Sequence, residues 1–355
     1  MTARQMVVPL AVMCSCLQAS IAPVQSQTAN DSAATKATAP NSVAAQLAKT
    51  PGRFAFVSNE ASHDVSIIDI ATARTVAVIP VGSRPRGIQA SRDGSRVFVA
   101  LSDDMPSEQG SGDAIVAIDV ATRTLVARYP VGTDPEQFAL LPNGTVLYAS
   151  NEDAGTLSAV DLASRRVRAT LVVGIEPEGV GASPDGRWVY ATAETSNSVS
   201  VISTASNKVV ANLLVDVRPR AVAFAPDGRR AYVTAEIGGS VSAIDTRGHR
   251  LVAKATLGKG DEKPVGVVVS PDGRKLYVAG GASARISVLD AATLRVTSTI
   301  AVGKRPWGIA LSPDGMRLYA ANGLSNTISV IDTETNTVVA TIGVGQRPWG
   351  VAIVR

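Results

Sequence analysis

The chain has 355 residues, of which 45% are hydrophobic and only 4% aromatic, with 30 glycines and 19 prolines. Glycine and proline at this density interrupt long helices, and the Val-, Ala- and Ile-rich apolar residues suit closely stacked sheets. The formal net charge of +4 comes without any run of five or six basic residues, and no apolar span of about 20 residues follows the first few dozen positions. These features exclude a basic nucleic-acid-binding arm and a membrane span from the main body of the chain.

The N-terminus has the pattern of a cleavable secretory leader over residues 1–26. Arg4 precedes an apolar stretch from Met6 to Leu17, and small residues follow around Ala22 to Ser26. Residues 27–50 are rich in Ala, Ser, Thr, Asn and Gln, which is typical of a flexible linker. The sequence therefore predicts a periplasmic or secreted protein whose folded part spans residues 51–355.

Both cysteines, Cys14 and Cys16, fall inside the predicted leader. Cleavage would leave a mature chain with no disulfide, no thiolate nucleophile and no covalent haem attachment. Met13, three positions before Cys16, is a poor match to a lipoprotein cleavage site, so the sequence favours cleavage over lipid anchoring.

A single repeat organises the rest of the chain. Its marker is an Asp-Gly or Asn-Gly pair, whose glycines are Gly94, Gly144, Gly186, Gly228, Gly273 and Gly315. A period of about 42 residues is typical of a four-stranded propeller blade. One period reads as four strands: Gly308 to Ser312, Arg317 to Ala321, Thr327 to Asp332 and Thr337 to Val344.

Turn chemistry accounts for the recurring acidic residues. In the Asp-Gly pairs glycine relieves the strain of a positive φ, and aspartate tolerates that backbone. An aspartate also closes the third strand of most repeats, where its carboxylate can accept N–H bonds from the following turn. These residues are Asp69, Asp119, Asp161, Asp245, Asp290 and Asp332. We interpret both sets as structural.

The phase of the repeat predicts how the ring closes. The body begins at Arg53 to Ser58, which corresponds to a second strand, and ends at Gly350 to Val354, which corresponds to a first strand. The C-terminal strand should therefore pair with the N-terminal three and complete their blade. The predicted fold is all-β: a seven-bladed propeller of four-stranded antiparallel blades.

Several strings carry a family resemblance over Arg53 to Arg355. AYVTAE, LYAAN, ISVID, VVATIGVG and RPWGIALSPDG resemble the YVTN propeller repeats. The order of the variant repeats, among them GTDPEQFALLPNG, IEPEGVGASPDG and a terminal GQRPWGV, resembles the β-propellers associated with pyrroloquinoline-quinone-dependent catabolism. That resemblance implies an association with periplasmic alcohol oxidation and its transport genes. About eight extra residues around Asp103 to Gly112 depart from the pattern.

A proline precedes the inner strand of every repeat, and the residues beside it vary in charge. Acidic residues come from two successive repeats, basic residues flank them, and two tryptophans follow together. We predict that this channel mouth binds a small polar or partly aromatic ligand, with arginines taking carboxylates and tryptophans stacking. The predicted residues are Arg84, Arg86, Glu136, Glu176, Glu178, Arg218, Arg220, Arg305, Trp307, Arg347 and Trp349. The alternative is a salt-bridged rim with a tryptophan plug.

The loops after the second strands should lie on the same face and offer oxygen ligands. Glu60, Asn151, Glu152, Glu194 and Glu236 are the candidates, and calcium is the ion that oxygen ligands of this kind suit. No nucleophile elbow of the Gly-x-Ser-x-Gly type is present, and only two histidines occur. No catalytic residue can be named from a motif.

Three functions fit this sequence. The preferred interpretation is a monomeric, non-enzymatic binding or scaffold propeller that serves a quinoprotein alcohol-oxidation or transport system, with a periplasmic protein or a small polar molecule as partner. Calcium and pyrroloquinoline quinone are the candidate cofactors. The first alternative is a lactonase-like hydrolase that uses the carboxylates of the channel mouth, and the second is a surface propeller that binds other proteins.

Overall fold

The computed structural model describes residues 52–103, 112–259 and 261–354. The predicted leader and linker, with both cysteines, lie outside the described residues, and so does most of the insertion between Asp103 and Gly112. Within the described ranges, no helix has the length and apolar character needed to cross a membrane.

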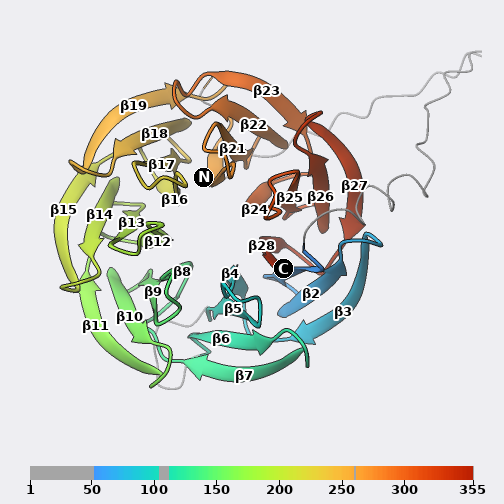
Figure 1. Cartoon of the computed structure of the whole chain (residues 1–355), viewed down its shortest axis with the longest axis horizontal. Coiled ribbons are helices and arrows are strands. Elements are labelled where there is room, and N and C mark those ends of the chain that lie inside the picture. The colour runs from blue at the N-terminus through green and yellow to red at the C-terminus, as the bar shows by residue number, and fades with distance from the viewer. Residues whose placement is uncertain (1–51, 104–111, 260, 355) are drawn as a thin grey trace, which may run out of the picture. The chain divides into compact units, whose positions relative to one another are not determined.

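Across the described residues, 28 strands form seven four-stranded antiparallel sheets that follow one another around a ring (Figure 1). This confirms the predicted seven-bladed propeller. From the channel outward, blade 1 comprises β28 (Pro348–Val354), β1 (Phe54–Asn59), β2 (Asp64–Asp69) and β3 (Arg74–Pro80). Blade 2 comprises β4 (Pro85–Ala90), β5 (Arg96–Leu101), β6 (Ala114–Asp119) and β7 (Thr124–Tyr129).

The remaining blades keep the same order. Blade 3 has β8 (Phe138–Leu140), β9 (Val146–Asn151), β10 (Thr156–Asp161) and β11 (Arg166–Val172). Blade 4 has β12 (Pro177–Ala182), β13 (Trp188–Ala193), β14 (Ser198–Ser203) and β15 (Lys208–Leu214). Blade 5 has β16 (Pro219–Phe224), β17 (Arg230–Ala235), β18 (Ser240–Asp245) and β19 (Arg250–Thr256). Blade 6 has β20 (Pro264–Val269), β21 (Lys275–Gly280), β22 (Arg285–Asp290) and β23 (Val296–Ala301). Blade 7 has β24 (Pro306–Leu311), β25 (Arg317–Asn322), β26 (Thr327–Asp332) and β27 (Thr337–Gly343).

The hydrophobic core lies between blades, because the middle strands are apolar on both faces. Ala55 and Phe56 are neighbours on β1 and point to opposite sides of the sheet. Phe56 packs with Val99 and other residues of blade 2, whereas Ala55 packs with Val330 and other residues of blade 7. Both β1 side chains are fully buried. Stacking of neighbouring blades therefore buries both faces of each sheet.

The turns confirm the structural interpretation of the acidic residues and refine it. Glycine in each Asp-Gly or Asn-Gly pair has a positive φ, as at Gly94 with 70°. Asp93 does not share that backbone, and its carboxylate instead accepts the N–H of Ser95 at 3.1 Å. At the end of the third strand of a repeat, Asp69 accepts the N–H of Thr72 at 2.9 Å. The side chains thus satisfy turn donors that the ladders leave unpaired.

The ring closes as the phase of the repeat predicted. β28 pairs antiparallel with β1, from Phe54 opposite Val354 to Ser58 opposite Gly350. The N–H of Arg53 also donates to the carbonyl of Val354 at 3.0 Å. Residues from the two ends of the propeller thereby build one sheet.

Neighbouring inner strands approach so closely that several blades need glycine two residues after the inner proline. A Cβ atom on Gly179 would lie 2.1 Å from the carbonyl oxygen of Arg220 in the next blade. We expect Gly179→Ala to lower the free energy of unfolding by about 1–3 kcal/mol, because the clash is with backbone. Gly343→Ala is the matched control, since nothing lies within 4 Å of its added Cβ and φ is not positive. Chemical denaturation of both variants tests this, and equal stabilities would contradict it.

Candidate functional site

One backbone device brings the channel-mouth residues together. The residue before each inner proline has a positive φ, for example 55° at Glu176 and 52° at Arg305. In six of the seven blades, as far as the structure describes them, the carbonyl oxygen of this residue accepts an N–H from the loop after the second strand. Examples are Glu194 to Glu176 at 2.8 Å and Gly323 to Arg305 at 2.9 Å. Both loops of a blade are thus held on one face, which we call the upper face.

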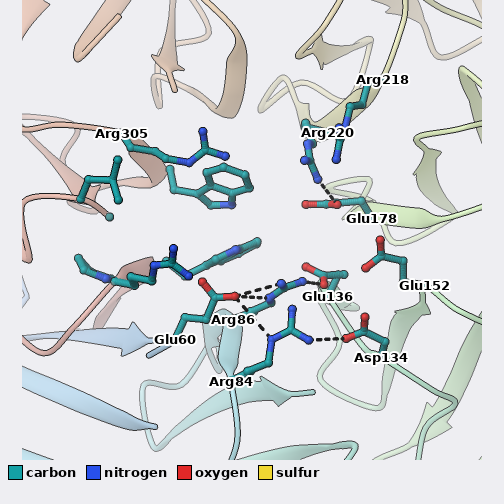
Figure 2. Close-up of a pocket in the computed structure, with 16 residues that line it drawn as sticks. Glu60, Arg84, Arg86, Asp134, Glu136, Glu152, Glu178, Arg218, Arg220 and Arg305 are labelled. Atoms are coloured by element: carbon teal, nitrogen blue, oxygen red, sulfur yellow. Dashed lines mark hydrogen bonds and ion pairs between the residues drawn. The ribbon is translucent and has the colours of Figure 1, made fainter. Parts of the chain in front are cut away.

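The upper face has a pocket of about 590 Å³ over the channel (Figure 2). Every predicted ligand residue except Glu176 lines it. The lining is Glu60, Arg84, Arg86, Asp134, Glu136, Glu152, Glu178, Arg218, Arg220, Arg305, Trp307, Gly323, Leu324, Arg347, Pro348 and Trp349. Glu176 lines a separate groove with Ile175 and Ser196, and its carboxylate accepts a hydrogen bond from Thr195.

Arg86 holds the carboxylates at the start of the acidic side. Its guanidinium contacts Glu60 at 3.0 Å and forms an ion pair with Glu136, whose side chain is almost fully buried. The neighbouring Arg84 lies 3.7 Å from both Glu60 and Asp134. These pairs compensate charges that burial alone would make costly.

Arg220 holds a second group of carboxylates, further round the ring. Its Nη1 contacts both Glu178 and Glu194, and its Nε donates to Glu236 at 2.7 Å. Arg218, whose side chain is 44% exposed, lies 2.6 Å from Glu194 on the outer side. Three carboxylates therefore share one buried guanidinium.

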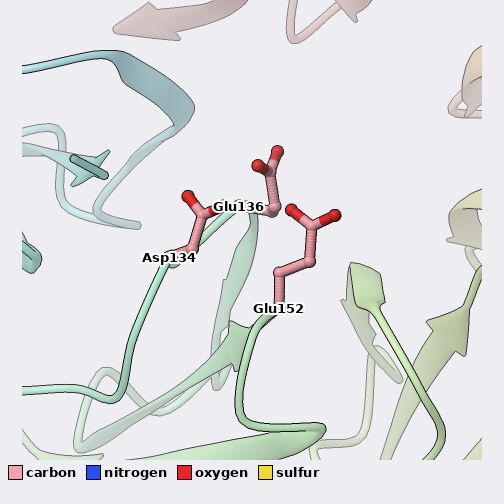
Figure 3. A group of neighbouring side chains, drawn as sticks. All are labelled: Asp134, Glu136 and Glu152. Carbon is pink, nitrogen blue, oxygen red and sulfur yellow. The ribbon is translucent and has the colours of Figure 1, made fainter. Parts of the chain in front are cut away.

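Glu152 lies between these two groups. Its carboxylate oxygens come within 4.8 Å of those of Asp134 and Glu136 (Figure 3), and within the same distance of those of Glu178 and Glu194. Among the described residues, every other carboxylate that lines the pocket forms an ion pair with an arginine, whereas the Glu152 side chain forms neither an ion pair nor a hydrogen bond. Burial, followed by the charges of Glu178 and Asp134, raises the pKa of Glu152 to about 7.

Glu178 and Glu194 are hydrogen-bonded to each other and titrate as a pair. Burial, followed by the hydrogen bond and charge of Glu178, raises the pKa of Glu194 to about 9. Burial also disfavours ionisation of Glu178, but the Arg220 charge and the hydrogen bond with Glu194 outweigh it and leave the pKa of Glu178 below its usual value. The pair therefore holds one proton at neutral pH.

The opposite side of the pocket is aromatic and cationic. The Trp307 and Trp349 ring centroids lie 6.0 Å apart, and the Arg305 guanidinium lies 4.6 Å from the Trp307 centroid. Figure 2 shows Arg305 across the pocket from Glu178 and Glu152. Among the residues described, no carboxylate lies within ion-pair distance of Arg305 or Arg347. The pocket is thus polarised, with two guanidinium groups available to an anion.

The residues predicted as metal ligands do not all converge. Glu152 and Glu194 lie together, but Glu60 contacts Arg86 and Glu236 contacts Arg220. Asn151 is buried within its blade, where it donates to Thr156 and Ser158 at 2.9 and 3.1 Å and accepts the N–H of Gly132 at 2.8 Å. These contacts leave few oxygen lone pairs free for a cation.

Four pocket residues were not predicted as ligand or metal residues: Asp134, Gly323, Leu324 and Pro348. Asp134 directly precedes the inner proline of blade 3, so the repeat could have indicated it. Leu324 follows the second strand of blade 7, at the position next to the one that Glu60 and Glu152 occupy in their blades. Leu324 is apolar, so a pattern of charged residues does not indicate it.

Comparisons with known proteins agree with this architecture. Residues 216–342, which span blades 5 to 7, match the family model described as lactonase, 7-bladed beta-propeller. No protein of curated function matches the sequence.

Solved structures match over most of the propeller. Hydrazine synthase from Kuenenia stuttgartiensis is 23% identical with a TM-score of 0.71, covering 80% of this chain and 96% of that one. A candidate 6-phosphogluconolactonase from Bacteroides uniformis is 20% identical with a TM-score of 0.69, covering 84% and 98%. Another, from Bacteroides fragilis, is 18% identical with a TM-score of 0.70, covering 86% and 99%. The chain is therefore similar in fold to seven-bladed propellers, and its last three blades match the lactonase model.

Proposed function

We propose that the upper-face pocket binds a small lactone that carries a negative charge and hydrolyses it. One observation carries this proposal. The Glu152 carboxylate, which forms no ion pair, lies across the pocket from the Arg305 guanidinium, which also forms none (Figure 2), and the ion-pair-free Arg347 lines the same pocket. A volume of about 590 Å³ suits a small molecule.

Glu152 is the candidate general base. A carboxyl with a pKa of about 7 is half ionised at neutral pH, and it is basic enough to take a proton from an attacking water. The other pocket carboxylates form ion pairs with arginines, so they are less available to act as the base. Water activated by Glu152 would attack the lactone carbonyl and form a tetrahedral oxyanion.

Arg305 and Arg347 would bind negative charge on the substrate and on that oxyanion. Guanidinium groups that no carboxylate neutralises attract an anion strongly in a partly enclosed site. The rings of Trp307 and Trp349 and the side chain of Leu324 supply apolar surface beside them. The substrate would therefore lie with its anionic end on the tryptophan side and its carbonyl toward Glu152.

The family comparison supports hydrolysis over a purely passive role. The match to the lactonase model covers blades 5 to 7, which supply Arg218, Arg220, Arg305 and Trp307 to the pocket. The two Bacteroides proteins, described as candidate 6-phosphogluconolactonases, share the fold across the whole propeller. A charged sugar lactone is thus a reasonable first substrate to assay.

The test is hydrolysis of a panel of γ- and δ-lactones, with and without a carboxylate or phosphate, by the purified mature protein. We expect turnover of charged lactones with kcat/KM falling below pH of about 7, because Glu152 must be ionised to act as the base. Glu152→Gln should lower kcat/KM by about 10²- to 10⁴-fold.

Glu176→Gln is the matched control, because Glu176 is also an upper-face glutamate but lies outside the pocket. We expect it to keep full activity. Absence of turnover across the panel, or equal losses in the two variants, would refute the proposed reaction.

The association with a quinoprotein system and the candidate cofactors remain predictions. Pyrroloquinoline quinone is a planar polycarboxylate, for which Arg305, Arg347 and the tryptophans are suitable contacts. Calcium has weaker support, since Arg86 and Arg220 already contact most of the acidic oxygens. Thermal unfolding with each compound tests both, because a ligand at 100 times its Kd stabilises by about 2.7 kcal/mol.

A further inference from the structure

The hydrogen-bonded pair of Glu178 and Glu194 has no role in the base step assigned to Glu152. Both side chains are about 4% exposed, their carboxyl oxygens come within 4.8 Å of each other, and both contact Nη1 of the same Arg220. Burial of two carboxyl groups this close together favours one shared proton over two negative charges. Glu178 lines the pocket, whereas Glu194 lies behind it and is not part of the lining. A proton on Glu194 would therefore be separated from a substrate in the pocket by Glu178 alone.

The position of the pair suits proton donation. The carboxyl oxygens of Glu178 and Glu194 lie within 4.8 Å of those of Glu152, so acid and base would flank one small reacting group. Opening of a lactone needs both functions, because the attacking water loses a proton and the departing ring oxygen gains one.

We propose that the Glu178–Glu194 pair is the general acid of this pocket, with Glu178 protonating the ring oxygen that leaves and Glu194 supplying the proton. Glu178 would be the catalytic residue, since it can contact substrate. Glu194 would be a positioning residue that acts through it. This inference rests on the proposed hydrolysis and deepens it.

Each step balances. Glu152 takes a proton from water as the oxygen of that water bonds to the carbonyl carbon. The bond between that carbon and the ring oxygen then breaks, and the ring oxygen takes a proton from Glu178, which receives it from Glu194. The proton on Glu152 returns to the pair through water, so lactone and water become a hydroxy acid and the enzyme is regenerated.

The surrounding arginines allow the proton to move. When Glu194 loses its proton, its new negative charge meets Arg220 and also Arg218, whose Nε lies 2.6 Å from its carboxylate. Neutralisation of the anion left behind lowers the cost of the transfer. Glu236, which contacts both arginines, completes the charged surroundings of Glu194.

The leaving group provides a sharp test. Two lactones that each carry a carboxylate are compared. The aliphatic δ-lactone releases an alkoxide, which needs an acid, whereas the carboxylated dihydrocoumarin, called dihydrocoumarin below, releases a phenolate, which does not. We expect Glu178→Gln to lower kcat/KM by about 10²-fold or more for the aliphatic lactone, and by far less for dihydrocoumarin. Glu152→Gln should lower both, because each reaction needs the base.

Glu194→Gln tests the positioning role through the pH profile. For the aliphatic lactone, wild-type kcat/KM should fall above pH of about 9, where Glu194 loses its proton, and this alkaline limb should be absent with dihydrocoumarin. We expect Glu194→Gln to slow the aliphatic lactone at all pH values and to abolish the alkaline limb. Equal losses on both lactones, with the limb unchanged, would overturn the inference while leaving hydrolysis intact.

A measurement without substrate separates failure of this inference from failure of the proposed function. At neutral pH the infrared difference spectrum between wild type and Glu194→Gln should contain the C=O stretch of a protonated carboxylic acid. Glu176→Gln, at an exposed carboxylate of the same face, should give no such band. Absence of the band in the Glu194 difference spectrum would show that the pair holds no proton and would overturn the proposal, whatever the lactone assays give.

Discussion

A chain that ends at Gly350 is expected to lose cooperative folding of the whole ring, with a fall in Tm of about 10 °C or more. The truncation removes the residues that pair with Phe54 to Val57 of β1. It also removes two buried apolar side chains, since Val351 and Val354 are 7% and 2% exposed in the intact protein. Each buried valine contributes about 1.5–3 kcal/mol, and the lost ladder adds to this. At about 2–4 °C per kcal/mol the combined loss gives a shift of this size.

A circular permutant distinguishes the missing strand from a general effect of a shortened chain. The N–H of Arg53 donates to the carbonyl of Val354, so a short linker can join the C-terminal strand directly to β1. With new termini opened between β27 and β28, the propeller should keep most of its thermal stability. A truncated chain that melts like the intact protein would show that β28 does not close the ring.

Arg220→Met is expected to destabilise the fold by about 3–5 kcal/mol at neutral pH. The substitution leaves Glu178, Glu194 and Glu236 without the buried guanidinium that contacts all three. Removal of one member of a buried charge network costs more than the network contributes, because uncompensated charge stays buried. Urea denaturation measures the loss directly.

The pH dependence of that loss has a definite sign. Arg220 holds the pKa of Glu178 below its usual value, so its contribution is present at neutral pH and lost as the pH falls through the pKa of Glu178 in the folded protein. The difference between wild type and Arg220→Met should therefore shrink in acid. Arg218→Met is the control: its side chain is 44% exposed, and we expect a loss of about 1 kcal/mol or less. A large loss that does not vary with pH would point to packing alone.

The repeat made the fold predictable from the sequence. Turn glycines such as Gly315 and strand-closing aspartates such as Asp332 recur at a nearly constant spacing. Each of them forms a turn whose conformation and hydrogen bonds involve only residues nearby in the chain. Closure by β28 was equally accessible, because it follows from where in the period the chain begins and ends. Even most of the pocket lining followed from the position of each inner proline.

What the repeat could not predict is where each of these side chains lies and what it contacts. Glu176 and Glu178 flank the same proline, yet one lies in an outer groove and the other in the pocket. Asn151 and Glu152 are adjacent, yet the first completes the hydrogen bonding of its blade and the second faces the pocket. Strand alternation and burial decide these outcomes, and both depend on the neighbouring blade.

The sequence by itself therefore determined the blades, their number, the closure of the ring and the face on which charged residues gather, because these depend on local turns and on periodicity. Only the tertiary structure decided the chemistry of that face. Arg220 comes from one blade and Glu178 and Glu194 from another, while the ion-pair-free Glu152 and Arg305 come from two more. The protonation of each carboxyl depends on distances between blades, which no spacing along the chain encodes.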